Sequence, residues 1–395
     1  MIVIRKVQLD GRTCDVLIDG NRFSEIGPDL SAPEAEEIDG SGFAILPPFY
    51  NAHTHAAMVV LRGAADDLNL FDWLSGHIWP AEAKLTKEDV YEANIRAIRE
   101  MILSGTVFFN DMYWYPETAV QAADEMGVRA CIGSVFLDGI QNAQEDQVRN
   151  FERLLDAPRS HRIQIGLAPH AVYTVSPEKL RLCGTLARKH GARVHIHASE
   201  TLKEVEDCLR EHGVTPIRHL ENCGILETDA VLAHCVHLTD ADREILVRRQ
   251  VTLAHCPRSN MKLASGMFSW KAAIQAGCSI ALGTDGAASS NNLDLGEEVK
   301  FAALSAKIQA QDPTAGSAKE VFHAATGFGA ERFGIDAGEI AVGKLADCIL
   351  VNLNNIRLKS GHSLISDMVY SADSECIDTV ICDGRILLKN RQFIV

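Results

Sequence analysis

Apolar, β-branched runs recur through the middle of the chain and alternate with segments of helical periodicity. The runs lie at Phe43–Leu46, Thr106–Phe109, Ala130–Phe136, Ile163–Leu167, Arg193–Ile196, Ala230–Ala233, Val251–Ala254 and Ser279–Leu282. Helical patterns between them are clearest over Glu88–Leu103, Pro177–Lys189 and Asp240–Arg249. Strands that alternate with helices predict a parallel sheet, and eight such units over roughly 250 residues are typical of a closed barrel. We therefore predict an α/β fold, a (β/α)8 TIM-like barrel, with an open doubly wound sheet as the alternative.

Both ends of the chain show short β patterns in place of this alternation. Near the start, the pattern predicts strands over Ile2–Ile4, Cys14–Ile18 and Arg22–Ile26, with a hairpin turn at Asp19-Gly20-Asn21. Near the end, it predicts strands over Asp347–Val351, Thr379–Cys382, Arg385–Leu388 and Gln392–Val395. We expect one small composite β-sandwich domain from residues 1–45 and 345–395, and a barrel domain over residues 46–344. Terminal strands that cap the barrel separately are the alternative.

Composition and charge narrow the class of partner. The chain has 395 residues, of which 47% are hydrophobic, and its formal net charge of -15 argues against nucleic-acid or anionic-membrane partners. The sequence contains no run of 18 or more apolar residues, so we expect no membrane span. Met1–Lys6 predicts a short strand rather than a secretory signal. Eleven cysteines without a Cys-x-x-Cys pair predict reduced thiols and a cytoplasmic location. The expected partner is a small-molecule substrate, and a homo-oligomer is compatible with the sequence.

Histidine or aspartate follows six of the eight predicted barrel strands. Chemistry in such a barrel lies at the C-terminal ends of the strands, which converge on one mouth. His53 and His55 follow the first run, and residues two apart in a strand point to the same face. The later strand ends carry His170, then His195, His197 and Glu200, then His234 and His237, then His255, and finally Asp285. This convergence predicts a metal site.

The chemistry of a catalytic ion narrows the set of ligands. Neutral imidazoles and one carboxylate leave a divalent ion with residual positive charge, which activates a water in an open position. The side chains that meet this need are His53, His55, Asp285 and one of His195 or His197. Two-metal sites of this kind usually need a bridging lysine near the fourth strand, and none lies between His161 and Ser176. We expect one divalent ion, Zn²⁺, with Fe²⁺ as the alternative.

The motifs at these strand ends together resemble those of the amidohydrolase superfamily. They are Asn51-Ala52-His53-Thr54-His55, His197-Ala198-Ser199-Glu200, Ala233-His234-Cys235-Val236-His237, His255-Cys256-Pro257-Arg258-Ser259-Asn260 and Gly283-Thr284-Asp285-Gly286. More narrowly, they resemble the branch of S-adenosylhomocysteine and 5'-methylthioadenosine deaminases and related chlorohydrolases, over nearly the whole chain. The resemblance implies that the metal ligands are His53, His55, His197 and Asp285, which selects His197 over His195.

The mechanism that the resemblance implies is hydrolytic deamination. Asp285 would accept a proton from metal-activated water, and Glu200 would protonate a ring nitrogen and then the departing ammonia. His234 would orient the nucleophile and stabilise the charge that develops on the tetrahedral carbon. The alternatives are an aminohydrolase or chlorohydrolase of another cyclic amidine, such as guanine, a pterin or a triazine, and a metal-binding barrel without catalysis.

The candidate substrate-binding residues come from the same resemblance. The segment Trp79–Glu82 resembles one whose glutamate binds ribose hydroxyls, which makes Glu82 and its neighbour Trp79 candidates, and His170 matches a substrate-contacting histidine. Homocysteine-binding members carry arginines after the third strand, whereas here no arginine follows until Arg149, and Arg129 precedes the strand. The sequence therefore predicts adenosine, 5'-deoxyadenosine or 5'-methylthioadenosine in preference to S-adenosylhomocysteine.

Overall fold

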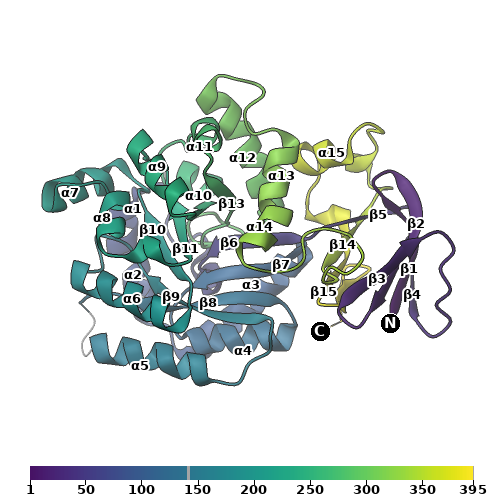
Figure 1. Cartoon of the computed structure of the whole chain (residues 1–395), viewed down its shortest axis with the longest axis horizontal. Helices are drawn as coiled ribbons and strands as arrows, with labels where there is room; N and C mark the ends of the chain where they lie inside the picture. The colour runs from purple at the N-terminus through teal and green to yellow at the C-terminus, as the bar shows by residue number, and fades with distance from the viewer. Residues whose placement is uncertain (140–142, 395) are drawn as a thin grey trace.

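Two sheets organise the computed structural model, which describes residues 1–139 and 143–394 (Figure 1). The first is a barrel of eight strands: β6 (Phe49–Thr54), β7 (Thr106–Met112), β8 (Arg129–Phe136), β9 (Ile163–Pro169), β10 (Val194–Ala198), β11 (Ala230–His234), β12 (Thr252–His255) and β13 (Ser279–Leu282). Neighbours along the chain pair in parallel, from β6 through to β13. Because β13 also packs against β6, the predicted barrel is confirmed and the open sheet is excluded.

The second sheet joins strands from both ends of the chain. Its members are β1 (Ile2–Leu9), β2 (Arg12–Asp19), β3 (Arg22–Gly27), β4 (Glu36–Asp39), β5 (Phe43–Leu46), β14 (Cys348–Asn352), β15 (Ile377–Cys382), β16 (Arg385–Lys389) and β17 (Gln392–Phe393). Strand β14 pairs antiparallel with β5, which unites the two termini in one sheet beside the barrel (Figure 1). The composite β unit is therefore confirmed and separate capping strands are wrong. Val395, at the end of the last predicted strand, lies outside the described residues.

One predicted barrel strand belongs to the other sheet. The run Phe43–Leu46 forms β5, which pairs with β1 and β14 rather than with a barrel strand. The first barrel strand, β6, begins only at Phe49. Pro47 and Pro48 separate the two strands, and since proline has no backbone N–H to donate, the ladder ends there and the chain passes from one sheet to the other. The division into domains at residues 45/46 and 344/345 stays a prediction.

Helices surround the barrel and cover its mouth. After β6 come η1 (Ala56–Leu61), α1 (Leu70–Trp73), η2 (Leu74–Ile78) and α2 (Trp79–Glu82). The barrel helices are α3 (Lys87–Leu103), α4 (Pro116–Met126), α5 (Ala143–Asp156), α6 (Pro177–His190), α7 (Leu202–His212), α8 (Pro216–Asn222), α9 (Asp240–Arg248), α10 (Pro257–Lys262), α11 (Trp270–Ala276), α12 (Leu295–Ala310), α13 (Ala318–Ala325) and α14 (Gly327–Arg332). The remaining short elements are η3 (Ile225–Glu227), η4 (Ile356–Leu358), α15 (Leu364–Tyr370) and η5 (Ser374–Cys376). The three clearest predicted helices are confirmed as α3, α6 and α9. Over the described ranges, no helix is both long and apolar enough to cross a membrane.

The barrel closes between β13 and β6 through hydrogen bonds at the level of the first motif. Asn51 Nδ2 donates to Thr284 Oγ1 at 2.7 Å, and Thr284 N donates to Asn51 Oδ1 at 3.1 Å. Asp285 N donates to the His53 carbonyl at 3.0 Å. A Cβ atom on Gly283 would lie 2.8 to 2.9 Å from His53 atoms, so only glycine allows this approach. Closure of the barrel therefore sets Asp285 against His53.

A buried ion-pair network fastens the small sheet to the opposite end of the barrel. Arg129, at the start of β8, donates from Nε and Nη2 to the carboxylate of Asp347 at 2.8 and 3.0 Å. The same Nη2 donates to Asp383 Oδ1 at 2.9 Å, and Tyr50 Oη donates to Asp347 Oδ2 at 3.0 Å. Arg129 is thus structural, at the end of the barrel far from the mouth, as its place before the strand predicts.

We expect the Arg129→Met variant to lose about 3–5 kcal/mol of unfolding free energy, because it removes the cation paired with the buried Asp347 carboxylate. Asp383 keeps its contacts with His161 and Arg162. Asp347 is 0% exposed, so water cannot replace the guanidinium. Urea denaturation followed by tryptophan fluorescence measures the loss. Arg149→Met is the matched control: Arg149 is an exposed residue of α5 that pairs with Asp146, and its loss should change stability by less than about 0.5 kcal/mol. Equal stability of the two variants would contradict the role of the network.

Candidate active site

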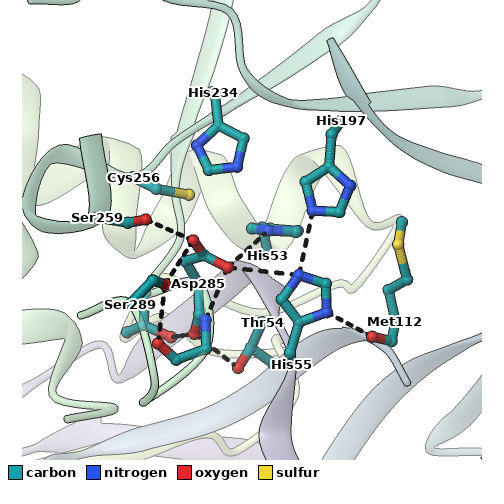
Figure 2. A network of polar contacts seen from close by, with 12 residues as sticks. His53, Thr54, His55, Met112, His197, His234, Cys256, Ser259, Asp285 and Ser289 are labelled. Carbon is teal, nitrogen blue, oxygen red and sulfur yellow. Dashed lines mark hydrogen bonds and ion pairs between the residues drawn. The ribbon is translucent and has the colours of Figure 1, made fainter. Parts of the chain in front are cut away.

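The four predicted metal ligands converge at the C-terminal end of the barrel (Figure 2). His53 Nε2 and His55 Nε2 lie 3.3 and 3.4 Å from Asp285 Oδ1, and His197 Nε2 lies 3.1 Å from His55 Nε2. The ligand atoms of His53, His55 and Asp285 all lie within 4.8 Å of one another. The ligand atoms of His53, His197 and His234 form a second such group, so His53 belongs to both, and His197 also contacts His55. Imidazole nitrogens and a carboxylate oxygen thus gather at this end of the barrel, and they are the kinds of ligand that a divalent catalytic ion binds.

The other nitrogen of each of these rings is already engaged. The Nδ1 atoms lie 2.7 Å from His195 Nε2 for His53, 2.5 Å from the Met112 carbonyl for His55, and 2.7 Å from the His170 carbonyl for His197. Hydrogen bonds at Nδ1 fix the ring orientation and turn Nε2 toward the centre. His195, which strand spacing alone does not distinguish from His197, thus contacts His53 from behind.

The chemistry of the site fits a cation. His53 Nε2 is buried and has no hydrogen-bond partner among the described residues, a state that costs about 1–3 kcal/mol unless another group satisfies the nitrogen. Burial lowers the pKa of His53 to about 4 and lowers the pKa of His197 well below its ordinary value. Neutral imidazoles keep the lone pair that a metal ion binds.

Two serine hydroxyls orient Asp285, as Figure 2 shows. Ser259 and Ser289 donate from Oγ to Asp285 Oδ2 at 2.5 and 2.8 Å, which leaves Oδ1 facing the histidines. The residue after Ser259 holds a second active-site group, because Asn260 Oδ1 accepts from His234 Nδ1 at 2.8 Å. Ser259 and Asn260 lie within one of the predicted motifs, but the sequence alone does not indicate these two roles.

The helix that carries these two residues, α10, is held against α12 by Arg258. Arg258 donates from Nε to Glu298 Oε1 at 2.6 Å and from its backbone N to Glu298 Oε2 at 3.1 Å, and so ties α10 to α12. Its Nη2 donates to the Asn292 carbonyl at 2.9 Å. Pro257 opens α10, where its fixed φ suits the first turn. Ser259, the partner of Asp285, and Asn260, the partner of His234, are neighbours in sequence because the same short helix, α10, positions both.

Glu200 and His234 face each other beside the ligand cluster. Glu200 is 3% exposed, its Oε2 lies 3.8 Å from His234 Nε2, and its Oε1 accepts from Ser265 Oγ at 3.3 Å. Burial raises the pKa of the Glu200 carboxyl. Burial alone would lower the pKa of His234, but the carboxylates of Glu200 and Asp285 raise it. A carboxyl and an imidazole with perturbed pKa values at the base of a pocket are candidates for proton transfer.

Left-handed backbone turns end the strands that bear this chemistry. Ser199, His234 and Asp285 have φ values of 52°, 70° and 59°, which are unfavourable for residues other than glycine. Such conformations cost about 1–3 kcal/mol each and persist where the surroundings enforce them. Each follows or ends a barrel strand, so these three unfavourable conformations lie at the mouth.

One pocket brings the predicted site residues together. It is lined by His55, His197, Glu200, His234 and Asp285 and also by the three predicted substrate-binding residues, Trp79, Glu82 and His170. His53 lies fully buried beneath it. The apolar walls, which sequence reasoning missed, include Leu70, Trp73, Trp114, Val135, Leu137 and Tyr173. Nothing in the local pattern separates these from core residues.

The outer part of the pocket has little cationic character. No arginine or lysine is among the described residues that line it. At the end of β8, Asp138 forms an ion pair with Lys179 at 2.6 Å, and Arg149 pairs with Asp146 on the exposed face of α5. A wider groove continues outward, where Arg153 lies together with Asp138 and Asp146. Deeper in, Glu82 Oε2 accepts from Trp114 Nε1 at 3.3 Å, and burial raises the pKa of Glu82.

Comparisons with known proteins agree with this geometry. The chain is 43% identical over 389 residues to a 5'-deoxyadenosine deaminase of Methanothermobacter thermautotrophicus, covering 97% of this chain and 91% of that one. It is 44% identical over 378 residues to a 5-methylthioadenosine/S-adenosylhomocysteine deaminase of Archaeoglobus fulgidus, covering 95% and 89%. The crystal structure of an adenosine deaminase from Xanthomonas campestris with bound zinc matches with a TM-score of 0.91 and 34% identity over 96% of this chain and 89% of that one. The model of the amidohydrolase family matches residues 44–387, and the chain therefore belongs to the amidohydrolase family.

Proposed function

We propose that this protein is a metal-dependent hydrolytic deaminase of an adenosine-type nucleoside and releases ammonia. The observation that carries the proposal is the placement of Glu200 and His234, which meet at 3.8 Å on one side of a His/Asp ligand cluster at the base of a pocket. Two of the relatives above are named as deaminases of 5'-deoxyadenosine and of 5-methylthioadenosine or S-adenosylhomocysteine, and a third as an adenosine deaminase.

The proposed cofactor is one zinc ion, with iron as the alternative. It would be held by four ligands, His53, His55, His197 and Asp285. In support, Asp285 Oδ1 lies 3.3 and 3.4 Å from the Nε2 atoms of His53 and His55, and His197 Nε2 lies 3.1 Å from His55 Nε2. When bound, a divalent ion lowers the pKa of a coordinated water and so supplies the nucleophile at neutral pH. The zinc in the related adenosine deaminase structure supports this choice.

The remaining steps belong to side chains of this chain. Asp285 Oδ1 faces the histidines and accepts the proton that the nucleophile loses. Glu200, whose pKa is raised by burial, gives its proton to the ring nitrogen, then takes up the proton of the new hydroxyl group on the ring carbon and passes it to the departing ammonia. The proton held by Asp285 returns to Glu200 before the next turnover. His234, fixed by Asn260, stabilises negative charge as the ring carbon becomes tetrahedral.

Substrate binding is assigned to the outer pocket. Glu82 would bind the ribose hydroxyls, with Trp79 and His170 beside the nucleoside. Around the 5' position the wall is formed by Val135, Leu137 and neighbouring aromatic side chains, which favour a small or apolar group. A homocysteine carboxylate would extend into the groove that Asp138 and Asp146 line together with Lys87 and Arg153, where the two acidic side chains oppose its charge. We therefore propose 5'-deoxyadenosine, adenosine and 5'-methylthioadenosine as the preferred substrates.

A panel of substrates tests the proposal. We expect purified zinc-loaded protein to release ammonia from 5'-deoxyadenosine, 5'-methylthioadenosine and adenosine with kcat/KM at least about tenfold above that for S-adenosylhomocysteine, since a lost bidentate carboxylate contact is worth about 1.4 kcal/mol or more. A coupled ammonia assay gives the values. Absence of ammonia from all four nucleosides would contradict the proposal, and equal values would contradict the preference.

Glu82 separates a nucleoside substrate from a free base. Glu82→Gln should raise KM for a nucleoside strongly but leave turnover of guanine, a pterin or a triazine nearly unchanged, because only the nucleoside offers ribose hydroxyls. The same panel extended to those compounds therefore tests the second candidate function.

The proposed location is the cytoplasm. All eleven cysteines are free thiols, and ten of them are buried, which suits a reducing compartment.

A further inference from the structure

A second glutamate lies behind Glu200 and takes no part in the steps above. Glu204, on α7, is 1% exposed and does not line the pocket. Both of its carboxylate oxygens accept backbone N–H groups: Oε1 from Ser199 at 2.9 Å and Oε2 from Glu200 at 2.7 Å. One buried carboxylate thus holds two consecutive peptide groups, one of which belongs to Glu200.

This contact differs from ordinary capping of the helix. Thr201 is the N-cap of α7, and its Oγ1 accepts from Glu204 N at 3.2 Å. In a capping box the glutamate at this position would return to the N–H of the N-cap residue. Here the carboxylate reaches past Thr201 to the two preceding residues, where the chain leaves β10 and Ser199 is left-handed.

The Glu204 carboxylate is buried, and burial is unfavourable for a charged group. Burial raises the pKa of Glu204 to about 7, and among the described residues no arginine or lysine forms an ion pair with it. Its backbone donors are the groups that offset its desolvation. Burying the Glu204 carboxylate costs desolvation free energy, and the contacts that offset this cost are its hydrogen bonds from the two backbone N–H groups.

We propose that Glu204 is a positioning residue for Glu200, a role that rests on the proposed deamination. By fixing the Ser199 and Glu200 peptide groups, it sets the backbone from which the Glu200 carboxyl reaches Ser265 Oγ at 3.3 Å and His234 Nε2 at 3.8 Å. A carboxyl that transfers a proton works only within hydrogen-bond reach of the accepting atom, so a small shift of its backbone costs turnover.

The Glu204→Gln variant tests the role with almost no change in volume. Glutamine presents one oxygen and one NH2 group, so one of the two backbone N–H groups loses its acceptor. We expect kcat for 5'-deoxyadenosine to fall about 10- to 100-fold, with KM within about twofold and an unchanged zinc content. The matched control is Glu206→Gln, an exposed glutamate on the same helix, which should keep wild-type kinetics.

A change of leaving group separates positioning from general damage. A 6-chloropurine nucleoside loses chloride, which needs no proton from Glu200 on departure, whereas an amino group leaves as ammonia. The Glu204→Gln variant should therefore lose at least about threefold less activity on the chloro compound than on the amino compound. An equal loss on both compounds would overturn the proposal in favour of a merely structural role.

Hydrogen exchange supplies a readout that needs no activity. In the wild type the amides of Ser199 and Glu200 should be protected, and in Glu204→Gln the peptide that contains them should exchange faster by mass spectrometry. An active wild type whose Gln variant keeps both kcat and this protection would overturn the positioning role while the proposed function stands. A wild type that releases no ammonia would contradict the proposed function, and the exchange result would still decide whether Glu204 holds this turn.

Discussion

Glu200→Gln is expected to lower kcat for nucleoside deamination by about 10²- to 10⁴-fold, the usual contribution of a positioned proton donor. Glutamine fills the same volume and can still accept from Ser265 Oγ, but it has no proton to give to the ring nitrogen or to ammonia. Because Glu200 is not among the ligand atoms that face the metal centre, the zinc content should stay at one equivalent. Steady-state ammonia release together with metal analysis by mass spectrometry measures both quantities.

The exposed Glu206 again serves as the control, since Glu206→Gln removes the same charge from the same helix without touching the pocket. A Glu200→Gln variant with kcat within tenfold of the wild type would show that another group delivers the proton. His234 would then be the first candidate, because its Nε2 lies 3.8 Å from Glu200 Oε2 and its pKa is raised despite burial.

The parts of the fold that the sequence predicted are those with a local signature. Seven of the eight barrel strands were found because parallel strands buried on both faces form continuous apolar runs, and the polar residues after them mark the mouth. Asn51 and Gly283 stand next to the ligands because they close the barrel, where Asn51 spans the gap to Thr284. Asn51 and Gly283 therefore belong to recognisable sequence motifs and also form the contacts that join β6 to β13.

His195 and His197 show where periodicity stops being informative. Both lie on the same face of β10, because residues two apart in a strand share a face. They differ in depth along the barrel by about 6–7 Å, two strand residues. Only the position of β10 relative to β6, a strand with which it does not pair, settles which ring reaches the centre, and that position places His195 Nε2 against His53 Nδ1. The relative position of two strands cannot be seen in the sequence of one.

Contacts between residues far apart along the chain explain both the wrongly assigned strand and the site residues that the sequence did not reveal. Phe43–Leu46 is as apolar as a barrel strand, and its place in the small sheet is decided by β1 and β14, which lie far from it along the chain. Ser289 and Glu204 are ordinary polar residues in sequence, and their roles arise from the carboxylate or backbone groups that the fold brings to them. Pocket walls such as Trp73 have the same composition as core, so composition cannot identify them.

Asp285→Asn is expected to abolish deamination, with kcat at least about 10⁴-fold below the wild type, because it removes a ligand and the proton acceptor together. Ser259 and Ser289 both donate to Asp285 Oδ2. If the asparagine oxygen keeps these bonds, its NH2 group faces His53 and His55. An amide NH2 group has no available lone pair, so it cannot bind a metal ion there. If the amide turns over, both serine hydroxyls lose their acceptor.

Removal and return of the metal distinguishes loss of the ion from loss of the base. A chelator such as dipicolinate should inactivate the wild type, and one equivalent of zinc should restore it, whereas zinc at the same concentration should leave Asp285→Asn inactive. Asp240→Asn, on a fully exposed side chain of α9, is the control and should respond as the wild type does. An Asp285→Asn protein that binds a full equivalent of zinc and turns over within tenfold of the wild type would exclude Asp285 from both roles. Full zinc binding without turnover would assign Asp285 chiefly to proton transfer, since three histidines then suffice to hold the ion.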